Sequence, residues 1–341
     1  MKIGIITVYD AMNNLGSYLQ GYALKQFLEE QGHQVYFLEN VPKSYHVKKT
    51  VLKINPKREF FLRIQKCGKF LKALKAFKTV KKENIEKEGF DCLIYGSDEI
   101  WNMDNKYFKD PFFFATDNKH QNKIAYAMSI GEMKKETLDE NIDIAKGIFK
   151  FKCIYVRDDH TKKVLEATLG KELKTVCDPT LLVPVEKLAK PIKLPKDKYI
   201  FVYTYGIDPP MIENIKKFAK EKGLKIVSAC FWHIWCDEII QCEPLQFSTL
   251  IKNAEYVFTT TFHGAIFTML NNKNCCILPI RYKVENVVKS LGVGEHLVTE
   301  DCSYEIFCKT IEKSFPKEEF VKKLSTLRET SQELLKEVLN D

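Results

Sequence analysis

The fold is decided by one stretch, Tyr256-Val257-Phe258-Thr259-Thr260-Thr261-Phe262-His263-Gly264-Ala265-Ile266-Phe267-Thr268-Met269-Leu270. It begins with a β-prone run, passes through three threonines and ends in an apolar helical run. This order predicts a strand, a tight polar turn and a helix N-terminus. Backbone N–H groups at such a helix start suit a phosphate or a carboxylate. His263 can hydrogen-bond that anion or transfer a proton; the alternative is that it caps the helix or packs against Phe262.

The length predicts two domains, because 341 residues exceed what one ordinary hydrophobic core supports. The charged fraction of 29% and the apolar fraction of 45% are typical of a globular protein. No apolar run reaches the roughly 18 residues of a membrane span. Residues 1–7 indicate a strand rather than a secretion signal. We therefore expect a cytoplasmic protein whose eleven cysteines are reduced, mostly buried thiols.

Positive charge is concentrated in residues 43–88, which carry 15 Lys/Arg and 4 Asp/Glu, whereas the whole chain is only +8. The rest of the chain is therefore slightly acidic, which argues against a general nucleic-acid binder. Apolar residues in this segment recur at three- and four-residue steps, which predicts an amphipathic basic helix over about 58–82. These apolar residues are Phe60, Phe61, Ile64, Cys67, Phe70, Leu71, Leu74 and Phe77. The helix either packs over the first domain or contacts an anionic partner, such as the inner membrane face or a lipid diphosphate sugar.

The first half alternates strands and helices. Ile3–Ile6 is followed by a turn containing Asn14, Gly16 and Ser17, in which Ser17 is a fair N-cap for the next helix. A single glycine there is weak compared with a dinucleotide fingerprint, so no nicotinamide cofactor is predicted.

Three later turns also follow strands. Ser97 and Asp98 come after Leu93–Tyr95, and Asp98 is a candidate general base or an N-cap. Trp101 could stack on a sugar face or fill the core. Ser129 follows strand 123–128. Arg157 follows strand 153–156 and either clamps an anion or forms a salt bridge to Asp158 or Asp178.

The second half repeats this alternation after a proline-punctuated linker that begins near Pro184. A strand at 276–278 leads to Lys283, and an amphipathic helix begins near Lys317. We therefore predict an N-terminal Rossmann-like domain over 1–185, carrying the basic insert, and a C-terminal one over 186–341. The spacing of Cys230, His233, Cys236 and Cys242 matches no familiar zinc pattern, so no metal is predicted.

Every polar cluster named above lies at the carboxyl end of a predicted strand. If the two parallel sheets face each other, the clusters converge on one interdomain cleft. This convergence favours a binding site more strongly than any single motif does.

These motifs, in this order, resemble the polysaccharide pyruvyl transferase family. The residues that carry the resemblance are Asn14-Leu15-Gly16-Ser17-Tyr18-Leu19-Gln20, Gly96-Ser97-Asp98-Glu99-Ile100-Trp101-Asn102, Tyr126-Ala127-Met128-Ser129-Ile130-Gly131, Val156-Arg157-Asp158, Asp178-Pro179-Thr180 and Phe262-His263-Gly264. The resemblance implies two facing Rossmann-like domains, as in GT-B glycosyltransferases. It also implies transfer of the enolpyruvyl unit of phosphoenolpyruvate to sugar hydroxyls of a cell-surface polysaccharide or its lipid-linked precursor, without a further cofactor.

The resemblance assigns provisional roles. His263 and Asp98 are the catalytic candidates, and the proposed donor-binding residues are Arg157, Lys283, Thr261 and Gly264. The acceptor or cleft residues are Asn14, Gly16, Ser17, Ser97, Trp101 and Ser129. Members of the family tend to carry arginine two residues before the histidine, where this chain has Thr261, and Lys283 stands where relatives often carry arginine. A nucleotide-sugar glycosyltransferase and a non-catalytic glycan-assembly subunit are the alternatives.

Overall fold

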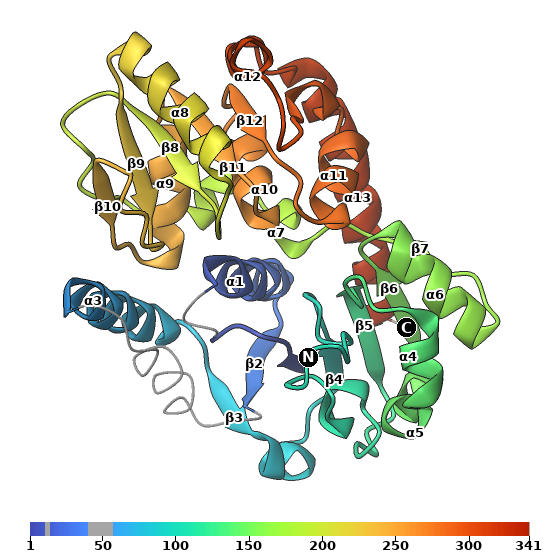
Figure 1. Cartoon of the computed structure of the whole chain (residues 1–341). Coiled ribbons are helices and arrows are strands. Elements are labelled where there is room, and N and C mark those ends of the chain that lie inside the picture. The colour runs from blue at the N-terminus through green and yellow to red at the C-terminus, as the bar shows by residue number, and fades with distance from the viewer. Residues whose placement is uncertain (11–13, 40–56, 341) are drawn as a thin grey trace. The chain divides into compact units, whose positions relative to one another are not determined.

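The computed structural model describes residues 1–10, 14–39 and 57–340. The contacts among these residues form two compact units, neither of which is contiguous in the chain (Figure 1). The first unit takes its described residues from 1–39, 74–183 and 326–340. The second takes them from 57–73 and 184–325.

The first unit is built on a parallel sheet whose order over the described residues is β3-β2-β1-β4-β5-β6-β7. Its strands are β1 (Lys2–Ile6), β2 (Gln34–Glu39), β3 (Thr79–Lys81), β4 (Cys92–Tyr95), β5 (Lys123–Met128), β6 (Cys153–Val156) and β7 (Lys174–Thr175). The central strands are short apolar runs buried throughout, as expected for parallel strands covered on both faces.

Helices connect these strands. They are α1 (Leu15–Glu30), α4 (Lys135–Glu140), α5 (Ile142–Ala145), α6 (Asp159–Leu169) and α7 (Pro179–Leu182), with 3₁₀ turns η1 (Lys82–Lys87), η2 (Pro111–Phe114) and η3 (Lys146–Lys150). The prediction that Ser17 caps α1 was wrong. Asn14 is the N-cap, and its side chain accepts a hydrogen bond from the backbone N–H of Gly16.

The second unit has a parallel sheet of order β10-β9-β8-β11-β12 over its described residues. Its strands are β8 (Tyr199–Tyr203), β9 (Lys225–Ala229), β10 (Glu238–Ile240), β11 (Tyr256–Thr259) and β12 (Cys275–Ile277). Its helical elements are α3 (Lys57–Leu74), α8 (Pro209–Lys222), α9 (Phe247–Lys252), α10 (Phe262–Leu270), α11 (Tyr282–Ser290) and α12 (Tyr304–Ile311), with η4 (Val185–Leu188), η5 (Pro244–Gln246) and η6 (Gly294–His296).

Alternate residues of β8 pack on opposite faces of this sheet. Val202 lies in the cluster that contains Phe218 of α8 and Phe307 of α12. Phe201 instead packs against Phe247 of α9, with the ring centroids 5.8 Å apart, and Phe247 contacts Phe267 of α10. The sheet is therefore covered by helices on both faces, so loops at its carboxyl edge are the natural place for a ligand.

The basic helix is shorter than predicted. α3 ends at Leu74, and residues 79–81 form β3, which pairs with β2 through Phe37 and Thr79. Phe77 packs against Phe37 in the first unit, with ring centroids 4.5 Å apart, so strand pairing and aromatic packing override the helical periodicity here. Residues 43–56 of the basic segment lie outside the described residues.

Two segments group differently from the sequence-based division at residue 185. We assigned α3 to the N-terminal domain, but its residues 57–73 group with the second unit. α13 (Lys317–Asn340) contributes its last residues to the first unit, where Ser331 Oγ accepts from the N–H of Cys177 at 2.9 Å. In both segments contacts between distant parts of the chain determine the grouping, and these are invisible to a reading of composition.

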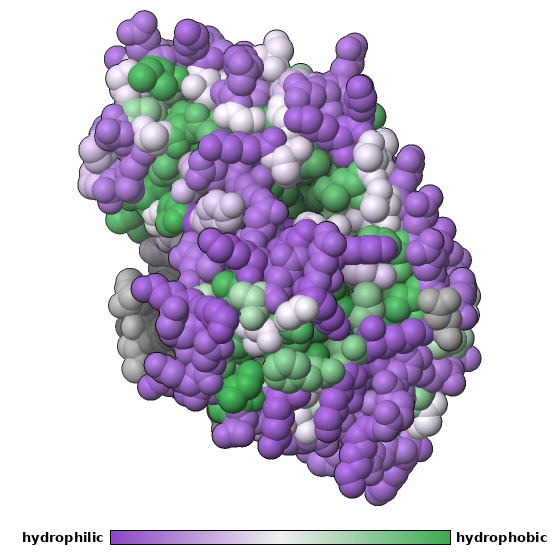
Figure 2. All heavy atoms as spheres, turned by 90° about the vertical axis from the view of Figure 1, so that its right-hand side faces the viewer, coloured by the Kyte–Doolittle hydropathy of each residue, from purple (hydrophilic) through white to green (hydrophobic). Residues whose placement is uncertain are grey.

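The surface seen in Figure 2 is predominantly hydrophilic, with hydrophobic residues in separate areas. Among the described helices, none combines the length and apolarity needed to cross a membrane.

Candidate active site

The sheet of the second unit reverses its strand order between β8 and β11, and ligands of open α/β sheets bind at such reversal points. Threonines join the two strand ends there. Thr204 Oγ1, just after β8, lies 2.8 Å from Thr260 Oγ1, just after β11. Thr259 Oγ1 donates to the carbonyl of Tyr203 at 2.7 Å. The carboxyl ends of these two strands are thus joined by a fixed network of polar side chains.

The start of α10 follows this edge, as the sequence predicted. Thr261 is the N-cap, and its Oγ1 accepts from the N–H of Gly264 at 3.0 Å. Gly264 lies so close to the threonines that an added Cβ would be 2.1 Å from Thr259 Oγ1 and 2.5 Å from Thr261 Oγ1. Thr261 and Gly264 therefore shape the helix start, and its N-terminal turn presents a positive dipole end.

His263 and Lys283 both contact the aromatic ring of Phe262. The His263 imidazole is 8% exposed and lies edge-on to Phe262, with the centroids 5.2 Å apart. Lys283, in the first turn of α11, places Nζ 5.4 Å from the centre of the same ring. The structure therefore brings together Thr261, His263, Gly264 and Lys283, which are four of the predicted site residues.

A second histidine, which the sequence analysis did not select as a site residue, borders the same strand ends. His233 follows β9, and its Nε2 lies 3.0 Å from the carbonyl oxygen of Thr204. Burial lowers the pKa of His233, while the hydrogen bond to Thr204 partly offsets this effect. A neutral ring that donates to the carbonyl is the result. The sequence contained one indication of this contact: Thr204 directly follows a predicted strand and therefore lies at the carboxyl end of the sheet.

The first unit has the equivalent reversal between β1 and β4. Thr7 Oγ1, after β1, donates to the carbonyl of Ser97, after β4, at 2.8 Å. Gln20, fully buried in α1, donates Nε2 to Thr7 Oγ1 at 3.1 Å and accepts from Ser97 Oγ at 2.6 Å. The sequence analysis missed Thr7 and Gln20, because these contacts join segments that are distant along the chain.

The predicted site residues at the start of α1 mainly form hydrogen bonds within the turn that begins this helix. Asn14 caps the helix and is partly exposed, whereas Gly16 and Ser17 are buried. Ser17 Oγ donates to the carbonyl of Asn14 at 2.8 Å. Asn14 is therefore the member of this trio that retains exposure to solvent.

Arg157 forms a buried ion pair with Asp178, with Nη1 and Oδ2 2.8 Å apart and side chains 4% and 1% exposed. Burial lowers the pKa of Arg157, but the carboxylates of Asp178, Asp98 and Asp158 raise it, and the net effect is a raised pKa. The structure thus contains the salt bridge that was the alternative to an anion clamp. Asp178 also accepts from the N–H of Thr180, so the pair anchors the start of α7.

Asp98 and Ser129 lie near this pair at the carboxyl ends of β4 and β5. Asp98 is half-buried, adopts a left-handed φ of 75° and accepts from the N–H of Glu99 through Oδ1. Ser129 Oγ donates to Asp158 Oδ2 at 2.8 Å. The structure therefore brings Asp98, Ser129 and Arg157 together, and of these Asp98 has a carboxylate with partial exposure.

Trp101 does not have the geometry of a sugar platform. Its ring is 1% exposed and stacks on Phe114, and its Nε1 donates to the carbonyl of Phe113 at 2.7 Å. A buried indole with a satisfied N–H fills the core, which was the alternative reading.

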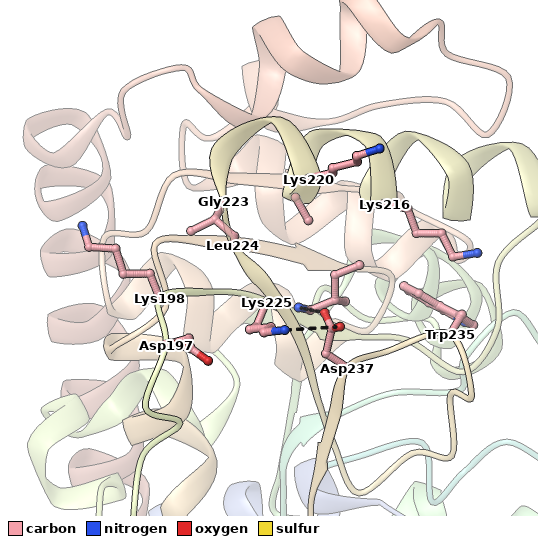
Figure 3. A pocket seen from close by; sticks show the side chains of 11 residues that line it. Asp197, Lys198, Lys216, Lys220, Gly223, Leu224, Lys225, Trp235 and Asp237 are labelled. Atoms are coloured by element: carbon pink, nitrogen blue, oxygen red, sulfur yellow. Dashed lines mark hydrogen bonds and ion pairs between the residues drawn. The ribbon is translucent and has the colours of Figure 1, made fainter.

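Lysines line a depression of about 680 Å³ in the second unit (Figure 3). It lies at the amino end of β9, where Lys225 pairs with Asp237 at 4.0 Å. Two other lining lysines also have acidic partners, since Lys198 pairs with Glu255 and Lys216 with Glu213. The depression therefore lies at the amino-terminal edge of the sheet, whereas Thr204 and Thr260 lie at its carboxyl-terminal edge. Because most of its lysines are also paired with acidic residues, we do not assign the active site to it.

Within the described residues, no group of three or more His, Cys, Asp or Glu side chains is arranged to hold a metal ion. Of the Cys/His set noted in the sequence, His233 contacts Thr204, whereas Cys230 and Cys242 contact each other with their Sγ atoms 3.6 Å apart.

Comparisons with known proteins add a family and a fold. The family model of polysaccharide pyruvyl transferase matches residues 14–282. No curated protein matches the chain in sequence.

Among solved structures, the chain is similar to UDP-GlcNAc 2-epimerase from Methanocaldococcus jannaschii, with 13% identity, 100% of each chain covered and a TM-score of 0.58. It is also similar to UDP-GlcNAc 2-epimerase from Neisseria meningitidis bound to UDP-GlcNAc, with 10% identity, 99% of each chain covered and a TM-score of 0.54. The glycosyltransferase SsfS6 from Streptomyces sp. SF2575 matches with 15% identity, 100% of each chain covered and a TM-score of 0.49. At these identities the likeness to the two epimerases concerns the fold alone, an α/β architecture with two parallel sheets.

Proposed function

Because the chain belongs to the polysaccharide pyruvyl transferase family, we propose that it transfers the enolpyruvyl group of phosphoenolpyruvate to sugar hydroxyls of a cell-surface polysaccharide or its lipid-linked precursor. Membership of the family makes the chain a transferase. The observation that supports this donor is the cluster formed by the α10 N-terminus, His263 and Lys283. It combines a positive helix end, a cation and a proton donor at a strand-order reversal.

The proposed chemistry assigns each group a step. The helix N-terminus and Lys283 bind the donor's phosphate and carboxylate. Protonated His263 delivers a proton to the methylene carbon, which becomes the methyl group, and positive charge develops on the neighbouring carbon. One acceptor hydroxyl bonds to that carbon and loses its proton. The carbon–oxygen bond to phosphate breaks, phosphate leaves, and the second hydroxyl closes the ketal with loss of its own proton.

The remaining site residues have supporting roles in this proposal. Asp98 is the proposed base for the acceptor hydroxyl, because it is a partly exposed carboxylate that follows β4. Arg157 is a positioning residue, since its guanidinium is already committed to Asp178. Thr261 supplies the cap of α10, a role for which arginine has no suitable acceptor atom.

Titration calorimetry with phosphoenolpyruvate tests the donor. Lys283→Met should raise the Kd by roughly 10- to 100-fold, the loss expected for a hydrogen bond to a charged group. Lys289→Met is the matched control, because Lys289 lies on the same helix and pairs with Glu285. If the protein binds nucleotide sugars but not phosphoenolpyruvate in this experiment, the donor is a nucleotide sugar. This alternative follows from Thr261, which stands where family members tend to carry arginine.

Turnover separates an enzyme from a glycan-assembly subunit. His263→Ala should abolish phosphate release while leaving the far-ultraviolet circular dichroism unchanged, and His33→Ala in the first unit should retain activity. Unchanged turnover in His263→Ala would remove His263 from the mechanism.

A further inference from the structure

Helix α3 has an apolar surface that its packing leaves open. Cys67, Phe70 and Ala73 are buried, as expected for the inner face of an amphipathic helix. Phe60 and Ile64 are nevertheless 43% and 44% exposed. At 100° per residue these two side chains lie about 40° apart on the helix, and Phe60 lies about 20° from Cys67, so they form an exposed apolar stripe along the edge of the buried face.

This stripe continues onto the loop between β9 and β10. Ile234 in that loop is 81% exposed, and Phe61 on α3 is 66% exposed. Both line a hollow of about 350 Å³ together with Leu62, Trp232, Cys236, Ile239 and one acidic residue, Asp237, whose carboxylate pairs with Lys225. We call this surface the α3–β10 face, and it consists of Phe60, Phe61, Leu62, Ile64, Trp232, Ile234 and Ile239. Large apolar side chains gathered in this way mark an interaction surface.

The α3–β10 face is held in a fixed shape by lysines. Lys66 Nζ donates to the carbonyl of Cys230 at 3.1 Å, at the end of β9. Lys69 donates to the carbonyl of Gln241, and Lys72 pairs with Glu243 at 2.8 Å. These contacts tie α3 to the residue that follows β9 and to two residues that follow β10, so the loop between the two strands and α3 are held together.

The charge of α3 identifies the class of partner. Residues 57–74 contain six Lys/Arg and one Glu, an excess of five positive charges. An apolar surface carried by a strongly basic helix complements a surface that is anionic at its rim and apolar beneath it. A phospholipid bilayer with anionic headgroups has this structure, whereas a nucleic acid would leave the aliphatic Ile64 and Ile234 without suitable contacts.

We propose that the α3–β10 face docks the protein on an anionic phospholipid surface. Phe61 and Ile234 insert at the boundary between headgroups and acyl chains, and the net positive charge of α3 attracts the anionic headgroups. The inference rests on the surface alone and not on the proposed reaction. It would place the enzyme where a lipid-linked sugar acceptor is found.

Vesicle pelleting with the full chain tests the proposal. Wild type should pellet with phosphatidylcholine vesicles containing about 30% phosphatidylglycerol at about 50 mM salt, and its partition coefficient should fall at least about tenfold near 500 mM salt. Phe61→Ser/Ile234→Ser should lower the partition coefficient at least about tenfold at low salt, because two exposed apolar anchors are lost.

The matched control is Ile306→Ser/Val321→Ser, which replaces side chains that are 53% and 45% exposed on α12 and α13. This variant should bind as wild type does. Circular dichroism melting of both variants verifies folding, since all four positions are exposed. Failure of wild type to pellet, or equal binding by Phe61→Ser/Ile234→Ser, would overturn the proposal. A dimer in sedimentation velocity that only Phe61→Ser/Ile234→Ser abolishes, with vesicle binding retained, would reassign the face to a second copy of the chain.

Discussion

Replacement of Arg157 by methionine should destabilise the first unit severely. The variant keeps most of the side-chain volume but leaves the Asp178 carboxylate, 1% exposed, without its ion-pair partner. Breaking a buried pair in this way costs about 3–5 kcal/mol, because the remaining charge is desolvated. With a urea dependence of about 2–3 kcal/mol per molar, the unfolding midpoint should fall by about 1–2.5 M.

The second variant, Arg157→Met/Asp178→Asn, separates charge from shape. Asparagine keeps an oxygen that can accept from the N–H of Thr180, so the start of α7 retains its cap. Because no buried charge is left alone, the double variant should lose less stability than Arg157→Met does. Strong non-additivity of this kind is the signature of a buried ion pair.

Trp101 provides the readout for this cycle. It lies in the core of the first unit, and the other two tryptophans, Trp232 and Trp235, belong to the second unit. In a Trp232→Phe/Trp235→Phe background, fluorescence during urea unfolding therefore reports the first unit. A loss below about 1 kcal/mol in Arg157→Met, or a double variant that loses the sum of the two single variants, would refute the reasoning.

Three further outcomes are expected. Gly264→Ala should cost about 2–4 kcal/mol in chemical unfolding, because its Cβ would collide with Thr259 Oγ1 and displace the α10 cap; a loss under 1 kcal/mol would show that the turn relaxes. Burial lowers the pKa values of His233 and His296 below the ordinary 6.5, so the unfolded chain binds protons that the folded chain does not, and stability should fall as pH drops below about 6.5; a urea midpoint that rises on acidification would contradict this. Trp101→Phe should lower stability without changing the KM for the acceptor, and a selective rise in KM would restore its role as a sugar platform.

The strand pattern was the most predictable part of the molecule. β5 and β6 occupy the bounds expected from their apolar runs, because parallel strands buried on both faces appear as short continuous hydrophobic segments. The start of α10 after Thr261 was equally predictable, because a strand, a polar turn and an apolar helical run follow one another in the sequence. Local sequence determines such features.

The differences between the expectations and the structure share one physical cause. β3 replaced the end of the predicted basic helix because residues 79–81 pair with β2, some forty residues earlier in the chain. Trp101 is in the core because Phe113 and Phe114 return to it. The contacts of Thr7 and Gln20 with Ser97 likewise join distant segments of the chain. Local hydrophobic periodicity therefore predicts where such residues lie in the fold but not which residues they contact.

The division of the chain constrains how the protein is made. The first unit is completed only by residues 326–340, in which Ser331 hydrogen-bonds to Cys177 and Gln332 Nε2 donates to the carbonyl of Leu182. During synthesis at about 5–20 residues per second, these contacts become available only after the whole second unit has left the ribosome. The surface of the first unit that these residues contact therefore stays uncovered until α13 emerges. A nascent chain stalled before residue 326 is the species that chaperones would be expected to bind.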